Sequence, residues 1–340
     1  MPQGYSHVMT DHLSRVPADQ ADQDEFDPSE LARTPGLQGY LARAADWRAR
    51  LDSSTGPLAL PPATESVPLL VLPPELSGVG QLAVALTAQA ERPLRLATAP
   101  LLLAQRPTSA LYWIDQDKLP IHQDPDQTTA LLPYLTQQST THLELDGDTH
   151  PVTALCTILH GVGLLRLLPD AESAPSAAGV YLARCLPLTP VPANPAKQIA
   201  LRIHQRLPIL VGDGMERAIL RDWAMRLHWR AQCIAWDLSG PDLARTGVLA
   251  RLPRYWPNSA CYVSLAGAPP SADTQVTQAA LELLRRRRFP VHSVSLPDGL
   301  HSAQRAWLSL ELGEWVALYV AWLNNADPSV RVPHTILFSA

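Results

Sequence analysis

Lysine is almost absent from this 340-residue sequence, and acidic residues outnumber basic ones. The lysines are Lys118 and Lys197, so a catalytic step that needs a lysine has two candidates. Because 27 lysines and arginines stand against 32 aspartates and glutamates, the formal net charge is −5 at pH 7. Proteins that bind nucleic acid need a basic face toward the phosphate backbone. The charge balance therefore argues against a nucleic-acid partner.

Cysteine is also scarce, with four residues far apart in the chain: Cys156, Cys185, Cys233 and Cys261. No two of them have the short spacing of a zinc site, so we expect no metal. Each lies among apolar residues, which predicts buried free thiols in a reducing compartment. The sequence also lacks a Gly-x-Ser-x-Gly elbow, a Walker loop and a dinucleotide fingerprint.

Long apolar runs are missing as well. The longest one, between Leu308 and Leu323, is interrupted by Glu311 and Glu314 and does not predict a membrane-spanning helix. The N-terminal residues have no apolar core of the kind found in signal peptides. Together these absences predict a cytoplasmic protein without a membrane partner.

Alternating strand and helix patterns fill most of the chain. They occur in residues 31–168, after a polar lead-in at 1–30, and occur again in residues 194–340. Residues 169–193, rich in Pro, Ala and Ser, are the best candidate for a linker. Continuous apolar strands between helices are typical of a parallel sheet that is covered on both faces. We therefore predict an α/β fold of two three-layer domains, each a parallel sheet covered by helices.

Two segments of the second half carry the motifs of a known family. The last helical stretch contains these residues in a characteristic order and spacing: Leu312, Gly313, Glu314, Tyr319, Ala321, Leu323, Asn324, Asp327 and Pro328. Residues 193–214, ANPAKQIALRIHQRLPILVGDG, and the pair Arg221 and Trp223 extend the match. On these residues the chain resembles the bifunctional phosphoglucose/phosphomannose isomerases, which are built from sugar isomerase (SIS) domains. The motifs lie within about residues 190–330, and before residue 150 the resemblance rests on element order.

The resemblance implies an activity and an assembly. Such enzymes convert glucose 6-phosphate or mannose 6-phosphate into fructose 6-phosphate, as homodimers and without a metal or organic cofactor. The reaction opens the sugar ring and moves a proton between C1 and C2 through an enediol. It therefore needs a carboxylate base, a ring-opening group and a phosphate cradle. An apolar face on the last helix also favours a dimer, and its members are Leu308, Leu312, Trp315, Val316 and Tyr319.

The phosphate cradle has a candidate after the first predicted strand. Ser77, Gly78 and Gly80 have the pattern of an anion site at a helix N-terminus, and equally that of a plain helix cap. The Ser/Thr-rich loop that the family has after a later strand is replaced here by residues 115–118, Asp-Gln-Asp-Lys. Further substrate contacts that the resemblance implies are Ser302 and Arg221.

The catalytic base is missing from the place that the family implies. There it is the Glu of an Asn-Glu-Asn-Ala segment, and Trp229 stands at that position here. An indole cannot act as the base, whereas the adjacent His228 carries a group that transfers protons. The ring-opening His of the family is also missing, and Asp237 lies in its region. The candidate catalytic residues are His228, Asp237, Glu216 and His301.

Three hypotheses follow. The protein is an isomerase with rearranged catalytic residues, in which case Glu216, Asp237, His228 or His301 must lie together in an inter-domain cleft. Alternatively, it is a non-catalytic relative that binds a sugar phosphate or similar anion. As a third possibility, it is a protein-interaction scaffold whose cleft is filled by side chains such as Trp229 and Trp236. Because the expected base is absent, the sequence predicts weak or no isomerase activity.

Overall fold

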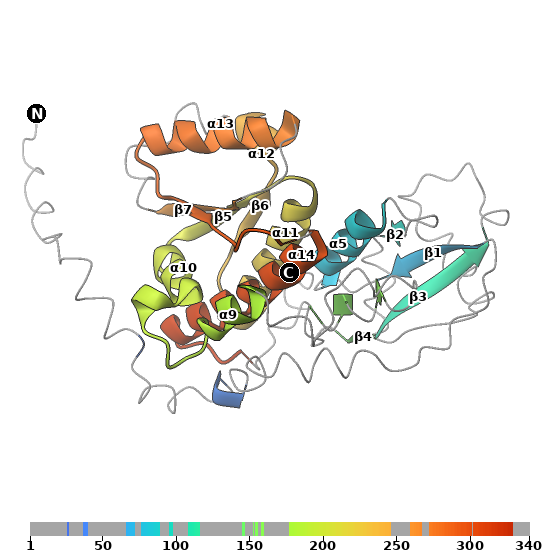
Figure 1. The fold of residues 1–340 in the computed structure, drawn as a ribbon, viewed down its shortest axis with the longest axis horizontal. Helices are drawn as coiled ribbons and strands as arrows, with labels where there is room; N and C mark the ends of the chain where they lie inside the picture. Colours follow the sequence, from blue (N-terminus) through green and yellow to red (C-terminus); the bar gives the residue numbers. More distant parts are fainter. Residues whose placement is uncertain are drawn as a thin grey trace, which may run out of the picture.

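The computed structural model describes the central and C-terminal parts of the chain most fully. The described residues are 26, 37–39, 66–71, 76–88, 95–97, 108–115, 145–146, 152, 154–155, 158–159, 177–245, 259–266, 272–300 and 302–328. They form two four-stranded sheets, and most of the helices lie around the second of them (Figure 1).

The second sheet is entirely parallel. It consists of β5 (Leu207–Val211), β6 (Trp236–Leu238), β7 (Ala260–Leu265) and β8 (Val291–Val294), in the order β6-β5-β7-β8. Every residue of β7 is buried, as expected of a strand that is covered on both faces. The prediction of an α/β fold with a parallel sheet covered by helices is confirmed for this part of the chain.

Helices cover both faces of this sheet and make a three-layer unit (Figure 1). Alternate side chains of each strand point to opposite faces, so Leu210 and Val263 join one core, whereas Ile209 and Tyr262 join the other. The first core is closed by α10 (Pro195–Ile203), α11 (Gly214–Ala231) and α14 (Ser302–Leu323). The second core is closed by α12 (Gly240–Arg245) and α13 (Ala272–Arg286).

Helix α14 runs through the interior of the protein. Almost all of its 22 residues are buried, including the apolar face that the sequence analysis assigned to a dimer contact. That face is intramolecular core because α10 and α11 pack along the helix. At the crossing with α11, the indole of Trp223 lies against Gly313 and donates a hydrogen bond to the Ser309 carbonyl (2.8 Å). No helix among the described residues is long and apolar enough to cross a membrane.

The first sheet is mixed, which corrects the prediction of a parallel sheet in this half. Its order is β2-β1-β3-β4, formed by β1 (Ser66–Val71), β2 (Arg95–Ala97), β3 (Thr108–Asp115) and β4 (Leu145–Asp146). The pair β1–β2 is parallel, but β3 is antiparallel to both β1 and β4. Only residues 98–107 join β2 to β3, and a parallel crossover needs about a dozen or more.

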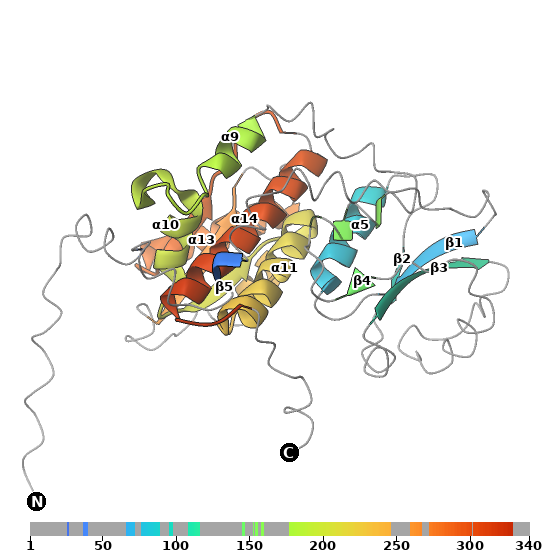
Figure 2. The same ribbon diagram turned by 90° about the horizontal axis from the view of Figure 1, so that it is seen from below.

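Helix α5 (Ser77–Thr87) joins the two halves by packing against α11 (Figure 2). The contact is close at Gly78. A Cβ there would lie 2.5 Å from the Asp222 nitrogen and 2.8 Å from the Ala218 carbonyl oxygen. Glycine is therefore required where the two helix backbones meet. Leu76, Val79 and other apolar residues of this helix belong to the same core as α14.

The predicted linker contains ordered structure in its second part. Helix α9 (Ala177–Ala183) and the 3-10 turn η5 (Val191–Ala193) lie there, and α9 packs on α14. Asn194 caps α10 by accepting a hydrogen bond from the Lys197 nitrogen (3.0 Å). Cys185 and Cys261 are buried free thiols, as predicted, and burial raises the pKa of Cys185 to about 12. The domain boundaries stay a prediction.

Candidate functional site

The carboxyl ends of the parallel strands meet at one edge of the second sheet. The chain leaves β5 toward β6 on one side and reaches β7 on the other, so the strand order reverses between β5 and β7. In open α/β sheets ligands bind outside the carboxyl ends of strands at such a point. Gly212, Asp213 and Gly214 form the turn from β5 into α11, where Gly214 has a φ of 52° that favours glycine. We call the polar groups around this turn the carboxyl-edge site.

Asp213 bridges three elements at this site. Its Oδ1 accepts a hydrogen bond from the Gly240 nitrogen at the start of α12 (3.0 Å). Its Oδ2 accepts one from the hydroxyl of Thr277 on α13. The Asp213 carboxylate therefore already binds the backbone N–H at the start of α12. This N–H is a group that could otherwise donate to a ligand anion.

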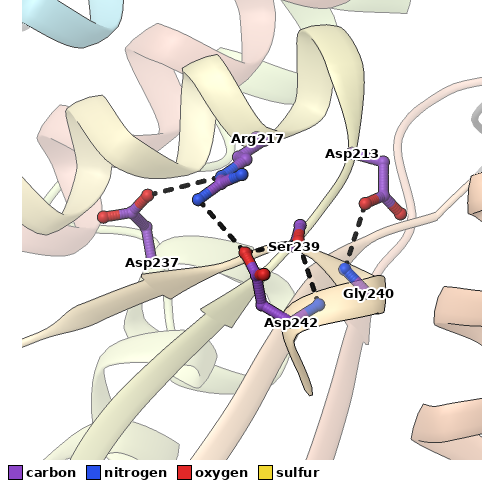
Figure 3. Close-up of polar contacts among 6 residues, drawn as sticks. All are labelled: Asp213, Arg217, Asp237, Ser239, Gly240 and Asp242. Atoms are coloured by element: carbon purple, nitrogen blue, oxygen red, sulfur yellow. Dashed lines mark hydrogen bonds and ion pairs between the residues drawn. The ribbon is translucent and has the colours of Figure 1, made fainter. Parts of the chain in front are cut away.

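Arg217 lies between two carboxylates in the first turn of α11 (Figure 3). Its Nε is 3.7 Å from Asp237 Oδ2, and its Nη2 is 3.5 Å from Asp242 Oδ2. The Ser239 hydroxyl donates to Asp242 Oδ2 (2.6 Å) and accepts from the Asp242 nitrogen (3.1 Å). This hydroxyl lowers the pKa of Asp242, and the Arg217 charge acts in the same direction. The positive charge of Arg217 is thus already balanced within the chain.

Glu216 and Arg305 form a second ion pair at the carboxyl edge. Arg305, in the first turns of α14, has its Nε 3.8 Å from Glu216 Oε1 and donates through Nη2 to the Ala266 carbonyl that follows β7. Both side chains are about nine-tenths buried. Burial raises the pKa of Glu216, and the nearby Asp213 adds to this effect, whereas Arg305 opposes it. The pair spans the point where the strand order reverses, because Glu216 follows β5 and Ala266 follows β7.

His228 is not part of the carboxyl-edge site. It lies in the last turn of α11, twelve residues after Glu216, which corresponds to about 18 Å along a continuous helix. Its side chain is exposed and lies edge-to-face with Trp229, with ring centroids 5.7 Å apart. The structure therefore places two predicted catalytic residues, Glu216 and Asp237, at the carboxyl edge and His228 at the opposite end of the layer. His301 lies outside the described residues.

The predicted substrate contacts are also spread over several places. Ser302 is exposed at the first residue of α14, three residues before Arg305, and belongs to the carboxyl edge. Arg221 lies half-buried in the middle of α11. Gly78 and Gly80 are buried in α5, where Gly78 has the packing role described above, and Ser77 makes no side-chain cap on that helix. These five residues stay predictions as substrate contacts.

Comparisons with known proteins identify the second half of the chain. Residues 192–333 match the family described as the bacterial phospho-glucose isomerase C-terminal SIS domain. The C-terminal part of this chain is a SIS domain. No curated protein matches the sequence. The resemblance found in the sequence is thereby confirmed.

Solved structures support the fold of this SIS protein. A glucose-6-phosphate isomerase like protein from Thermus thermophilus is 18% identical with a TM-score of 0.52, covering 86% of this chain and 93% of its own. A hypothetical protein from the same organism is 14% identical with a TM-score of 0.51 (94% and 92% covered). The C-terminal domain of glucosamine-fructose-6-phosphate aminotransferase from Francisella tularensis is 12% identical with a TM-score of 0.50 (89% and 97% covered). At these identities the likeness shows the fold.

A buried ion network locks α11 to α14 in the SIS domain. Asp222 Oδ1 lies 3.6 Å from Arg226 Nη2, and the two oxygens of Glu314 lie 3.8 Å from Arg226 Nε and 3.4 Å from Arg230 Nε. Burial raises the pKa of Asp222 to about 6. Glu314, which belongs to the matched motif of the last helix, thus has a structural contact inside the protein. No group of His, Cys, Asp and Glu that fits a metal ion occurs in the part of the chain that the structure describes.

Sequence reasoning missed the most connected residues of the carboxyl-edge site. Asp213 and Arg217 follow β5 directly, and polar residues at the carboxyl end of a parallel strand are the signal that could have pointed to them. Arg305 stands three residues after Ser302, within the matched segment. Its partner Glu216 was found, but the pairing joins residues 89 positions apart and has no local pattern.

Proposed function

We propose that this protein is a phosphosugar isomerase-like SIS protein that binds a sugar phosphate or a similar anion and turns it over weakly or not at all. The observation that carries the proposal is the separation of the candidate proton-transfer groups. Within one chain, Glu216 and His228 lie at opposite ends of α11, and neither can reach a substrate that the other contacts. General acid–base catalysis needs these groups within hydrogen-bonding distance of the reacting atoms.

The groups that remain at the carboxyl edge are poorly suited to form an enediol. Removal of the C2 proton requires an ionised base that is free to approach the carbon. Glu216 faces Arg305, and Asp237 faces Arg217, so each carboxylate already has a cationic partner in the chain. Trp229, which the family resemblance aligns with the base, lies at the far end of the helix. These contacts support weak or absent turnover.

Anion binding is supported by a different set of features at the same edge. The N-termini of two long helices, α11 and α14, lie there and favour negative charge. Of the two arginines, Arg217 has two carboxylates beside it, whereas Arg305 pairs with one, Glu216, among the described residues. Burial raises the pKa of Glu216, so its charge is more easily neutralised than that of an exposed glutamate. Arg305 is therefore the residue that we expect to anchor the anion.

Thermal-shift measurements with glucose 6-phosphate, mannose 6-phosphate, fructose 6-phosphate and inorganic phosphate test this proposal. We expect at least one sugar phosphate to raise the Tm of the wild-type protein and to have no effect on Arg305→Met. Arg286→Met, on the exposed face of α13, is the matched control and should keep the shift. Unaltered shifts in Arg305→Met, or no shift in any of these proteins, would contradict anion binding at the carboxyl edge.

A scaffold role has one observation in its favour. Ile234 and Trp236 are 65% and 52% exposed on and beside β6, the edge strand of the sheet, so Trp236 fills no cleft. Apolar side chains along an open strand edge favour pairing with another chain. We propose that the protein is a cytoplasmic homodimer that uses this edge. Light scattering of the wild type and of Trp236→Ser tests it, and a wild-type mass of 37.1 kDa at micromolar concentration would contradict a dimer.

A further inference from the structure

An aromatic recess on the SIS domain holds a residue from the distant N-terminal part of the chain. Phe26 is only 4% exposed and belongs to the core formed by α10, α11 and α14. Its ring meets Tyr319 edge-to-face at 5.4 Å and 77°, and Trp322 at 5.6 Å and 87°. These are favourable geometries for aromatic pairs. Tyr319 and Trp322, together with Lys197, form what we call the aromatic recess.

Lys197 supplies a positive charge to this recess. Its ammonium lies 5.3 Å from the centre of the Phe26 ring and 5.5 Å from that of Tyr319. It also donates to the carbonyls of Pro187 (2.6 Å) and Thr189 (3.0 Å). Burial lowers the pKa of this lysine. The cation is therefore fixed in place by backbone carbonyls, and the faces of two aromatic rings complete its surroundings.

The recess holds its shape through contacts that do not involve Phe26. The Tyr319 hydroxyl donates to the Cys185 carbonyl (2.6 Å) and accepts from the Asn194 amide (3.4 Å). The Tyr319 ring also stacks between Trp315 at 5.9 Å and Trp322 at 6.4 Å. A site whose walls are fixed in this way loses little entropy when an aromatic side chain enters.

We propose that the aromatic recess is a docking site for the chain's own acidic N-terminal segment, with Phe26 as the anchor that straps this segment to the SIS domain. The sequence around the anchor is Asp24-Glu25-Phe26-Asp27, so carboxylates flank the aromatic residue that enters beside a lysine. A buried aromatic side chain in a well-packed pocket is typical of the anchor residues of interfaces. This inference does not depend on the proposed function, because the recess lies on α10 and the C-terminal turns of α14, away from the carboxyl edge.

Peptide binding in trans tests the strap. A fluorescent peptide of residues 20–32 is titrated by anisotropy into the full-length wild type, Phe26→Ala and Phe26→Leu. The strap occupies its own recess in the wild type, so we expect binding at least tenfold tighter to Phe26→Ala. A peptide carrying the same Phe→Ala change should bind none of the proteins. Adding Lys197→Met to the Phe26→Ala chain should weaken binding several-fold.

Phe26→Leu keeps the proposal testable if Phe26→Ala does not fold. Leucine retains apolar volume but lacks the ring, so the peptide should displace it and bind more tightly than to the wild type. Equal affinity for all folded chains, or no binding to any of them, would overturn the proposal. A wild-type dimer that becomes monomeric in Phe26→Leu would assign the recess to a second copy of the chain and would likewise overturn an intrachain strap.

Discussion

The two ends of α11 carry candidate catalytic residues in different surroundings. At its N-terminal end, Glu216 and Arg217 each pair with a charged residue of another element, and their side chains belong to the carboxyl edge of the sheet. At its C-terminal end, His228 is exposed and Trp229 stands where the family resemblance places a carboxylate. One helix thus carries candidate catalytic groups to two separate places, and no single cleft can use both.

The middle of α11 is held in place by contacts with α5 and α14. Gly78 of α5 touches its backbone near Asp222, and Gly313 of α14 lies against Trp223. The ion network of Asp222, Arg226 and Glu314 is buried on the α14 side. A helix that is packed this closely on two sides is held in place.

The largest effect on stability is expected from a substitution at Gly78, which packs against the middle of α11. In Gly78→Ala the new methyl group would overlap backbone atoms of Asp222 and Ala218, which cannot rotate away. We expect a loss of about 1–3 kcal/mol or more in the free energy of unfolding, measured by urea denaturation. Gly39→Ala, also at a helical position but with nothing within 4 Å of a Cβ, is the matched control and should leave the stability unchanged or raise it by up to about 1 kcal/mol. Equal stability of the two variants would show that α5 does not lock α11.

A smaller effect, dependent on pH, is expected at Asp222. Burial raises its pKa from the ordinary 3.8 to about 6, so the folded protein holds this proton more tightly than the unfolded chain does. The resulting stabilisation is full below about pH 4 and is lost as the pH rises through 6. Two pKa units correspond to about 3 kcal/mol at most.

Asp222→Asn isolates this contribution. We expect wild-type stability to fall relative to that of the variant between pH 4 and pH 7, by up to about 3 kcal/mol, in urea denaturation at each pH. If the two stability curves run parallel across this range, Asp222 does not titrate as described.

A substitution of Glu216, at the N-terminal end of α11, should change the affinity of the protein for an anion. Glu216→Gln removes the charge beside Arg305 and leaves the guanidinium free to attract an anion. We expect inorganic phosphate to bind several-fold more tightly by calorimetry, with the gain reduced at high salt. Glu282→Gln, in an exposed ion pair on α13, should leave the affinity unchanged. A lower affinity in Glu216→Gln would mean that the carboxylate contacts the ligand favourably.

The smallest effect is expected at the C-terminal end of α11. His228 is exposed and far from the carboxyl edge, so His228→Ala should change the free energy of unfolding by less than about 0.5 kcal/mol. It should also leave the thermal shifts with sugar phosphates unaltered. A loss of those shifts would place the ligand at this end of the helix instead.

The sequence predicted the second sheet better than the first for a physical reason. Strands such as β7 are buried along their whole length and mostly apolar because both faces are covered, and this pattern is local. The direction of β3 depends on the short connection from β2, which the strand pattern alone does not reveal. Of the site, Glu216 and Asp237 were predicted, whereas their cationic partners lie on elements that only the fold brings together.

The most direct test is a coupled assay of fructose 6-phosphate formation from glucose 6-phosphate, run on the purified wild type and on His228→Ala and Trp229→Glu. The separation of Glu216 from His228 predicts a wild-type rate that is absent or far below that of an ordinary isomerase, and no further loss in His228→Ala. Because Trp229 lies away from the carboxyl edge, Trp229→Glu should also stay inactive. An ordinary enzymatic rate in the wild type that His228→Ala abolishes would contradict the account.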